Sequence, residues 1–316
     1  MMAMAKVLFG RPWIWSWVAA GAAFGLIMAL TQGRGAAELA YAALSFGAFA
    51  AIVGLGQMMV ITLGPGNVDL SIPAVMTLSG TLALKGMATD PGTALLGLAI
   101  AVGVGCGAGL ANFALIHLLR LPPIIATLAA SLIYQSLAIW SNRGLRIKPP
   151  AGLADFATGR TLGLPNVALV GLALSVVVWI VLERSVFGRW LLGTGQNPRA
   201  ARLAGLPTDL VRIVTYLTVA VLAAVAGYLL ASFSGGASLN MGQEYLLSSI
   251  AVVVIGGTSI AGGNSNVPGI WGASLFLFLV VSMLNSYGFG AGARMMLTGL
   301  IIIGIVVAAS TRRARA

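Results

Sequence analysis

Charged residues are scarce in this chain of 316 residues. Aspartate, glutamate, lysine and arginine together make up 8% of the sequence, whereas a soluble domain carries about 25%. A soluble fold of this length could not cover its surface with so few charges. A soluble globular enzyme, a disordered chain and a nucleic-acid-binding domain are therefore excluded. The hydrophobic fraction of 59% indicates instead a polytopic membrane protein that lies in a lipid bilayer.

Cysteine and histidine occur only once each. The single cysteine, Cys106, lies in an apolar run. Because it has no second cysteine to pair with, no disulfide can form within the chain. We interpret His117, near the end of an apolar segment, as an interfacial side chain rather than a proton relay. The sequence also has no Ser–His–Asp set, no paired carboxylates in an apolar segment and no cluster of metal-binding residues. It therefore predicts no catalytic site, no metal site and no cofactor held by this chain.

Ten apolar segments are candidate membrane helices. A spanning helix needs about 20 apolar residues, because the hydrocarbon core is about 30 Å thick and a helix rises about 1.5 Å per residue. The third and eighth candidates are short and bounded by glycine or proline, so they could be half-helices that enter the membrane and turn. The ten segments are residues 13–31, 40–62, 70–84, 93–119, 122–140, 164–182, 213–232, 246–261, 267–285 and 293–310.

The basic residues predict an orientation, because lysine and arginine concentrate on the cytoplasmic side. If ten spans start from a cytoplasmic N-terminus, 11 of the 18 basic residues fall inside and seven outside. The long loop 184–212 and the basic tail 312–315 lie inside, although the outside loop 141–163 is also basic. Both termini are thus predicted to be cytoplasmic. Spans 2–5 and 7–10 then have opposite topologies, which is the layout of an inverted repeat.

The first irregular segment runs from Leu63 to Pro73. Its Gly-Pro-Gly run breaks a helix, and Pro73 disfavours the helical region for the residue before it. A carboxylate at membrane depth, such as that of Asp69, is costly unless it is paired or hydrated. Two interpretations are possible. In the first, the segment borders a translocation path or shapes its gate through Asn67, Asp69 and Ser71. In the second, Asp69 and Ser71 cap the next helix. The two interpretations are compatible.

The second irregular segment, Val254–Asn264, is rich in glycine. It superficially resembles a phosphate-binding loop, but the required lysine and the serine or threonine after it are absent. Energy for uphill transport must then come from an ion gradient or from another polypeptide. The residues of this segment that are candidates for the path or gate are Gly256, Gly257, Thr258, Ser259, Gly262 and Gly263.

Alternating glycines mark the fourth apolar segment. No strand precedes them, so they are not a dinucleotide-binding fingerprint. The pairs Gly103–Gly107 and Gly105–Gly109 match the small-xxx-small pattern that lets membrane helices approach closely.

The third irregular segment, Gly193–Pro207, lies in the loop 184–212. Asn197 can cap a helix, Pro198 suits the first helical position, and Gly205 stops the helix. A helix of about two turns is marginal alone, so it needs a surface on which to dock. That surface is either the chain's own bundle or lipid headgroups, or else a groove in a cytoplasmic partner. The residues alone leave both possibilities open.

Together the three segments resemble the membrane permease subunits of ribose-type bacterial ABC importers, a family that handles monosaccharides, other small polar solutes and autoinducer-2. Asp69-Leu70-Ser71 is similar to the family's Gly-Gly-Ile-Asp-Leu-Ser element, although Gly64–Val68 replaces the usual residues before the aspartate. The stretch 195–206 is similar to its cytoplasmic coupling segment, and Gly256–Gly263 is the most specific match. The similarity covers residues 40–310.

The resemblance implies one transmembrane permease domain over residues 1–316, an all-α polytopic protein of about ten transmembrane helices with an inverted-repeat core and broken helices. This permease of the bacterial inner membrane would be a transport subunit, not an enzyme, and would move a monosaccharide or similar small polar solute inward. Its partners would be a second permease copy or homologue, cytoplasmic ATPase subunits that bind ATP, and a periplasmic or extracellular solute-binding protein. The residues that would couple to the ATPase are Gly195, Asn197, Ala200, Ala201, Arg202, Leu203 and Gly205.

Three other functions are compatible with parts of the sequence. A branched-chain amino-acid ABC permease shares the architecture, but the segment Gly256–Gly263 favours the sugar branch. An ion-coupled secondary transporter would need intramembrane acidic residues or histidine, and only Asp69 qualifies. A passive channel or a membrane-assembly protein would leave the helix at 197–204 without a purpose.

Overall fold

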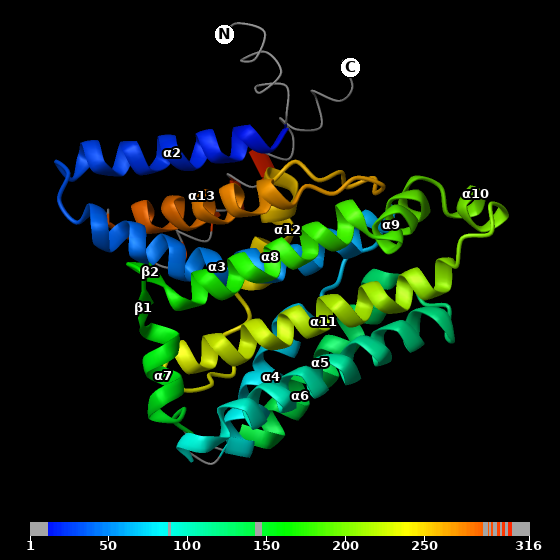
Figure 1. Ribbon diagram of the computed structural model, residues 1–316, viewed down its shortest axis with the longest axis horizontal. Helices are drawn as coiled ribbons and strands as arrows, with labels where there is room; N and C mark the ends of the chain where they lie inside the picture. The colour runs from blue at the N-terminus through cyan, green and yellow to red at the C-terminus, as the bar shows by residue number, and fades with distance from the viewer. Residues whose placement is uncertain are drawn as a thin grey trace, which may run out of the picture.

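The computed structural model describes residues 12–87, 90–142 and 147–286, and a few positions between 290 and 304. Helices dominate these residues (Figure 1), as expected for an all-α polytopic membrane protein. They are α2 (Pro12–Leu30), α3 (Ala36–Thr62), α4 (Ile72–Met87), η1 (Pro91–Thr93), α5 (Ala94–His117), α6 (Pro123–Asn142), α7 (Ala151–Thr158), α8 (Asn166–Arg184), α9 (Val186–Gln196), α10 (Pro198–Leu203), α11 (Thr208–Phe233), α12 (Tyr245–Ile255) and α13 (Val267–Ser286).

Seven of the described helices are long and apolar enough to cross a membrane, namely α2, α3, α5, α6, α8, α11 and α13. The predicted short segments correspond to α4, with 16 residues, and α12, with 11 residues. A helix of 11 residues rises only about 17 Å, roughly half of the hydrocarbon core. The predicted tenth span, 293–310, lies almost entirely outside the described residues, so a total of ten stays a prediction.

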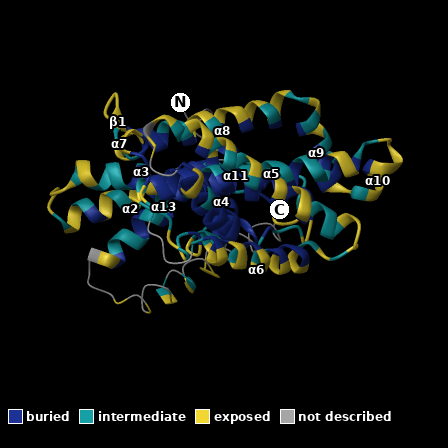
Figure 2. Ribbon diagram, turned by 90° about the horizontal axis from the view of Figure 1, so that it is seen from below, coloured by how far each residue is buried: buried dark blue, intermediate teal, exposed yellow. Residues whose placement is uncertain are grey.

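The core forms where two groups of helices meet along α3 and α11. Helices α12, α13 and α8 pack on α3, and α2 packs on α13. On the other side, α4 and α5 pack on α11 and α6 packs on α4, as Figure 1 shows. In α3, 83% of the residues in the most apolar stretch are buried, against 28% in α5. Figure 2 shows the buried residues gathered around α3, α4 and α11 and exposed residues along α6 and α8. The apolar faces of these outer helices are therefore the ones available to lipid.

The contact between α5 and α11 depends on one of the two predicted glycine pairs. A Cβ atom at Gly105 would lie 2.7 Å from Cα of Val221, and one at Gly109 would lie 2.6 Å from the carbonyl oxygen of Tyr216. No side chain fits there, so the small-xxx-small prediction is confirmed for Gly105–Gly109. The other pair, Gly103–Gly107, faces open space.

A small hairpin precedes α8, which the sequence analysis did not predict. Strand β1 (Arg160–Thr161) pairs antiparallel with β2 (Leu164–Pro165). The two turn residues between them, Leu162 and Gly163, have φ angles of 54° and 79°. Such turns favour asparagine or glycine, yet Leu162 occupies the first position and is 95% exposed. Figure 1 shows the hairpin and α7 at the end of the molecule opposite α10.

Candidate coupling and gating site

The predicted helix in the long loop is present as α10, and its N-terminus is capped. The side-chain oxygen of Asn197 accepts hydrogen bonds from the backbone N–H groups of Arg199 and Ala200, at 3.1 and 3.0 Å. Pro198 is the first helical residue, where its missing N–H group costs nothing. Two of the donors that a helix start leaves unpaired are thus satisfied by one side chain.

The C-terminus of α10 is closed by a Schellman motif. Gly205 adopts a left-handed φ of 81°, which favours glycine. The N–H of Leu206 donates to the carbonyl oxygen of Ala201 at 3.0 Å, and the N–H of Gly205 donates to that of Arg202 at 3.1 Å. Caps at both ends explain how so short a helix keeps its shape outside the bundle.

Helix α10 presents an apolar side chain at the tip of the molecule. Figures 1 and 2 show α10 projecting from the bundle with an exposed surface. Leu203 is 90% exposed, whereas Ala201 is buried against its own chain. An exposed leucine on a rigid, polar loop is the kind of side chain that a partner protein buries.

The turn before α4 is closed by Asp69. One carboxylate oxygen of Asp69 accepts hydrogen bonds from the backbone N–H and the hydroxyl of Ser71, at 2.8 and 2.6 Å. Both residues are buried, with Asp69 1% exposed. Among the described residues, Asp69 forms no ion pair, so hydrogen bonds alone compensate its burial. The carboxylate therefore closes the turn that precedes α4, and the role of Asp69 beside the translocation path stays a prediction.

Side chains from three helices complete this buried network. Asn112 on α5 donates to the hydroxyl of Ser71 at 2.8 Å and, at 3.5 Å, to Asp69. The hydroxyl of Tyr134 on α6 lies 3.0 Å from the side-chain oxygen of Asn112. The backbone N–H of Asp69 donates to the side-chain oxygen of Gln57 on α3 at 3.3 Å. The sequence analysis missed Gln57, Asn112 and Tyr134; the available signal was a polar side chain inside an apolar helix.

The glycine-rich segment turns back on itself after α12. Gly257, Gly262 and Gly263 have φ angles of 89°, 85° and 67°, a region that residues with a side chain rarely adopt. The side-chain amide of Asn266 donates to the carbonyl oxygen of Gly256 at 2.7 Å. The turn thereby brings the end of α12 against the start of α13, where a Cβ at Gly256 would lie 2.9 Å from the backbone of Gly269.

The three irregular segments meet at their glycines. The backbone N–H of Gly263 donates to the carbonyl oxygen of Thr62 at the end of α3, at 2.9 Å. Gly195, near the end of α9, packs directly on both residues, and Gly262 packs on Gly64. The structure thus brings together parts of all three segments, whereas Asp69 and Ser71 lie in the separate network with Asn112.

The sequence matches one family of membrane proteins over most of its length. The family model described as "Branched-chain amino acid transport system / permease component" covers residues 39–306. A probable ABC transporter permease protein, y4mJ of Sinorhizobium fredii, is 33% identical over 83% of this chain and 80% of its own length. The chain belongs to this family of ABC transporter permeases.

Two further relatives carry the names of transported solutes. The ribose import permease protein RbsC of Bacillus subtilis is 29% identical over 80% of this permease and 78% of its own length. The autoinducer 2 import system permease protein LsrC of Yersinia enterocolitica is 30% identical over 81% of this permease and 71% of its own length. No solved structure matches the sequence significantly. Family membership makes the permease a transport subunit in the membrane and implies ATPase and substrate-binding partners.

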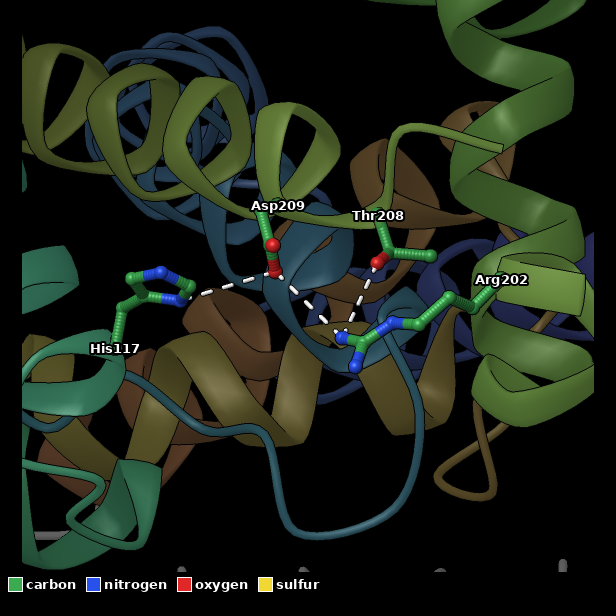
Figure 3. A network of polar contacts seen from close by, with 4 residues as sticks. All are labelled: His117, Arg202, Thr208 and Asp209. Atoms are coloured by element: carbon green, nitrogen blue, oxygen red, sulfur yellow. Dashed lines mark hydrogen bonds and ion pairs between the residues drawn. The ribbon is translucent and has the colours of Figure 1, made fainter. Parts of the chain in front are cut away.

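Polar contacts tether the projecting helix of the permease to its bundle (Figure 3). Arg202 on α10 lies 3.4 Å from the hydroxyl of Thr208 and 3.7 Å from the carboxylate of Asp209, both on α11. The same carboxylate oxygen lies 3.7 Å from Nδ1 of His117 at the end of α5. The side chains of Arg202, Asp209 and His117 are all well exposed, so each contact contributes at most about 1 kcal/mol. The tether orients α10 and still lets it move.

The remaining residues predicted for the path or gate are Asn67, Thr258 and Ser259. The side-chain amide of Asn67 donates to the carbonyl oxygen of Gly64 at 3.1 Å, and the hydroxyl of Tyr216 donates to Asn67 at 3.5 Å. Thr258 and Ser259 are buried within the glycine-rich turn. Asn67 therefore links the first segment to α11.

Proposed function

We propose that this permease imports a monosaccharide or a similar small polar solute by alternating access, driven by ATP hydrolysis in separate subunits. Relatives named for ribose, galactofuranose and autoinducer 2 support this solute class, as does the segment Gly256–Gly263. The matched family model is described by branched-chain amino-acid transport, so an amino-acid permease is the second candidate.

The observation that carries the proposal is the capped, projecting helix α10 with its exposed Leu203. A cytoplasmic ATPase would bury this leucine in a groove, with the neighbouring Arg202 and Ala200 at the rim. Asn197 and Gly205 would hold the shape of the helix, while Ala201 and Gly195 would act through packing within the permease. This chain supplies the docking helix and, in the proposal, no nucleotide or metal site; ATP binds to the partner subunits.

In this proposal α10 is cytoplasmic, because it lies in the basic loop 184–212. The hairpin with Leu162 lies at the opposite end (Figure 1) and would face the periplasmic or extracellular solute-binding protein. Both termini would be cytoplasmic, and the inverted-repeat core of about ten spans would pair with a second permease. The gate would be formed by Asn67, Asp69, Ser71 and the glycine-rich turn, with the short helices α4 and α12 beside them.

Docking can be tested by co-expressing the permease with candidate ABC ATPase subunits and capturing the complex in detergent. We expect Leu203→Glu to lower ATPase capture about tenfold, because a buried apolar anchor is replaced by a charge. Leu162→Glu is the matched control, since this leucine is equally exposed at the opposite end, and it should leave capture unchanged. Equal capture by both variants would remove α10 as the docking site.

The solute class is tested separately in cells that express the complete importer. Uptake of labelled ribose should be competed by other monosaccharides and not by leucine. Uptake that is competed by leucine and not by other monosaccharides would establish the amino-acid permease. Uptake that persists without any ATPase and follows an ion gradient would instead indicate a secondary transporter, with Asp69 as the first residue to test.

A further inference from the structure

The end of α9 contacts the end of α3 and the glycine-rich turn through close approaches of their backbones. A Cβ at Gly195 would collide with the carbonyl oxygen of Thr62 and lie 2.5 Å from the backbone nitrogen of Gly263. A Cβ at Gly262 would collide with Cα of Gly64. We call Thr62, Gly64, Gly195, Gly262 and Gly263 the glycine junction. Contacts this close have no slack, so a displacement of one segment displaces the others.

The glycine junction lies directly on the route from the docking helix into the membrane. Only Asn197 separates α9 from α10, so the two helices share a capped corner and move together. On the other side, Thr62 ends α3. Its hydroxyl donates to the carbonyl oxygen of Met58 in its own helix at 2.7 Å and lies 3.3 Å from the carbonyl oxygen of Asn264. The glycine-rich turn in turn joins the short α12 to α13.

The same helix α3 reaches the buried polar network. Gln57 lies five positions before Thr62 on α3, and its side-chain oxygen accepts a hydrogen bond from the backbone of Asp69. A shift of the end of α3 therefore acts on both the glycine-rich turn and the turn before α4. These are the two segments that the proposal assigns to the gate.

Two buried hydroxyl groups on the contacting segments have no hydrogen-bond partner among the described residues. They belong to Thr194, beside Gly195, and to Thr258, in the glycine-rich turn. Both side chains are at most 3% exposed. An unpaired buried hydroxyl costs free energy, so close backbone packing, rather than hydrogen bonds from these two side chains, holds the segments together.

We propose that the glycine junction is the point at which movement of α10 passes into the transmembrane helices. When a partner moves α10, α9 carries Gly195 with it, and Gly195 displaces the end of α3 and the glycine-rich turn as one unit. Gly195 is thus a positioning residue for transport rather than a contact for the ATPase. This inference rests on the proposed function of α10, and its test separates docking from transmission.

The first test compares glycines that share a backbone conformation but differ in their surroundings. Gly195→Ala forces α9 away from α3, whereas a Cβ at Gly193 on the same helix meets only a leucine methyl group at 3.7 Å. Gly262→Ala and Gly66→Ala carry similar strain, with φ of 85° and 79°, but a Cβ at Gly66 meets nothing. We expect the two junction variants to lower solute transport about tenfold with ATPase capture within about twofold of the parent. The Gly193 and Gly66 controls should retain both.

The second test locks the junction reversibly, in case the junction variants fold poorly. Gln196 and Asn264 are exposed residues on its two sides and are replaced by cysteine in a Cys106→Ser background. A short, reducible bis-thiol linker should leave transport and ATPase binding near the unlinked level, because two sides that move as one unit tolerate a link between them. Loss of transport in the linked complex that reduction restores would overturn the inference, because the two sides would then have to move apart. Parallel loss of ATPase capture and transport in Gly195→Ala would overturn it as well. A parent permease that captures no ATPase would instead refute the proposed function of α10.

Discussion

The side-chain amide of Asn112 donates a hydrogen bond to the hydroxyl of Ser71 across 2.8 Å. This bond joins the middle of α5 to the turn before α4 inside a region that is otherwise apolar. The hydroxyl of Ser71 donates to the carboxylate of Asp69, and the hydroxyl of Tyr134 on α6 lies within hydrogen-bonding distance of the side-chain oxygen of Asn112. In a low-dielectric core, such a chain is valuable only when every member is paired.

Replacement of Asn112 by alanine should therefore destabilise the permease. Ser71 would lose the donor amide, and the hydroxyl of Tyr134 would keep only the carbonyl oxygen of Ala108 as an acceptor. The expected cost is about 0.5–1.5 kcal/mol in the free energy of unfolding. Thermal unfolding in detergent measures the effect as a lower Tm. Ser136→Ala is the matched control, because Ser136 is an exposed residue that bonds only to its own helix. A Tm equal to that of the control would mean that the network contributes nothing.

Asp69→Asn should lower transport more than it lowers expression. Asparagine keeps one oxygen for Ser71, but it turns an NH2 group towards the donor amide of Asn112, so the link to α5 weakens while the turn survives. Uptake per amount of permease in the membrane measures this split. Asp90→Asn is the control, since Asp90 closes an exposed turn before α5 in the same manner, by accepting from Gly92. Unchanged transport would leave Asp69 with only the turn to stabilise.

The sequence was sufficient to predict the three irregular segments of this site, but not the contacts between them. Helix-breaking glycines and prolines, and the Asn-Pro start of α10, are local signals, and each segment was located correctly from them. The contact of Gly195 with Thr62 and Gly263 joins residues far apart in the chain, and no local pattern predicts it. A glycine in a turn and a glycine at a backbone contact look identical in one sequence.

The buried network was missed for a different reason. Gln57 and Asn112 are polar residues in apolar helices, but a helical segment alone does not show which face turns inward. The hairpin at Leu162 was not predicted, because a leucine is unusual at a turn position with a left-handed φ. Asp69 was found because a charge in an apolar setting has few explanations, whereas its partner Asn112 lies 43 positions away in the chain and could not be predicted from a local pattern.

Close packing of α5 on α11 gives a prediction that separates two adjacent faces of one helix. Gly109→Leu should strongly destabilise the fold, because its side chain would have to enter the backbone of α11 at Tyr216 and Leu217. Gly107→Leu should leave the Tm nearly unchanged, since a Cβ there meets nothing within 4 Å. Both substitutions add the same side chain to an apolar helix, so helix propensity cancels in the comparison. Equal losses of Tm would show that α5 does not pack on α11 through this pair.

The capped shape of α10 can be tested without touching its exposed surface. Asn197→Ala removes the oxygen that accepts from Arg199 and Ala200, which costs about 0.5–2 kcal/mol of helix stability. For so short a helix this loss is enough to disorder it. We expect lower ATPase capture with unchanged insertion of the permease into the membrane.

Rescue distinguishes the cap from a direct contact of Asn197 with the partner. Asn197→Asp and Asn197→Ser keep an acceptor oxygen at the N-terminus of the helix, and both should restore capture to near the parent level. Aspartate also places a negative charge at the positive end of the helix, so it should rescue at least as well as serine. If neither variant restores capture while Asn197→Ala abolishes it, the asparagine itself is recognised by the ATPase, and the shape of α10 matters less than its surface.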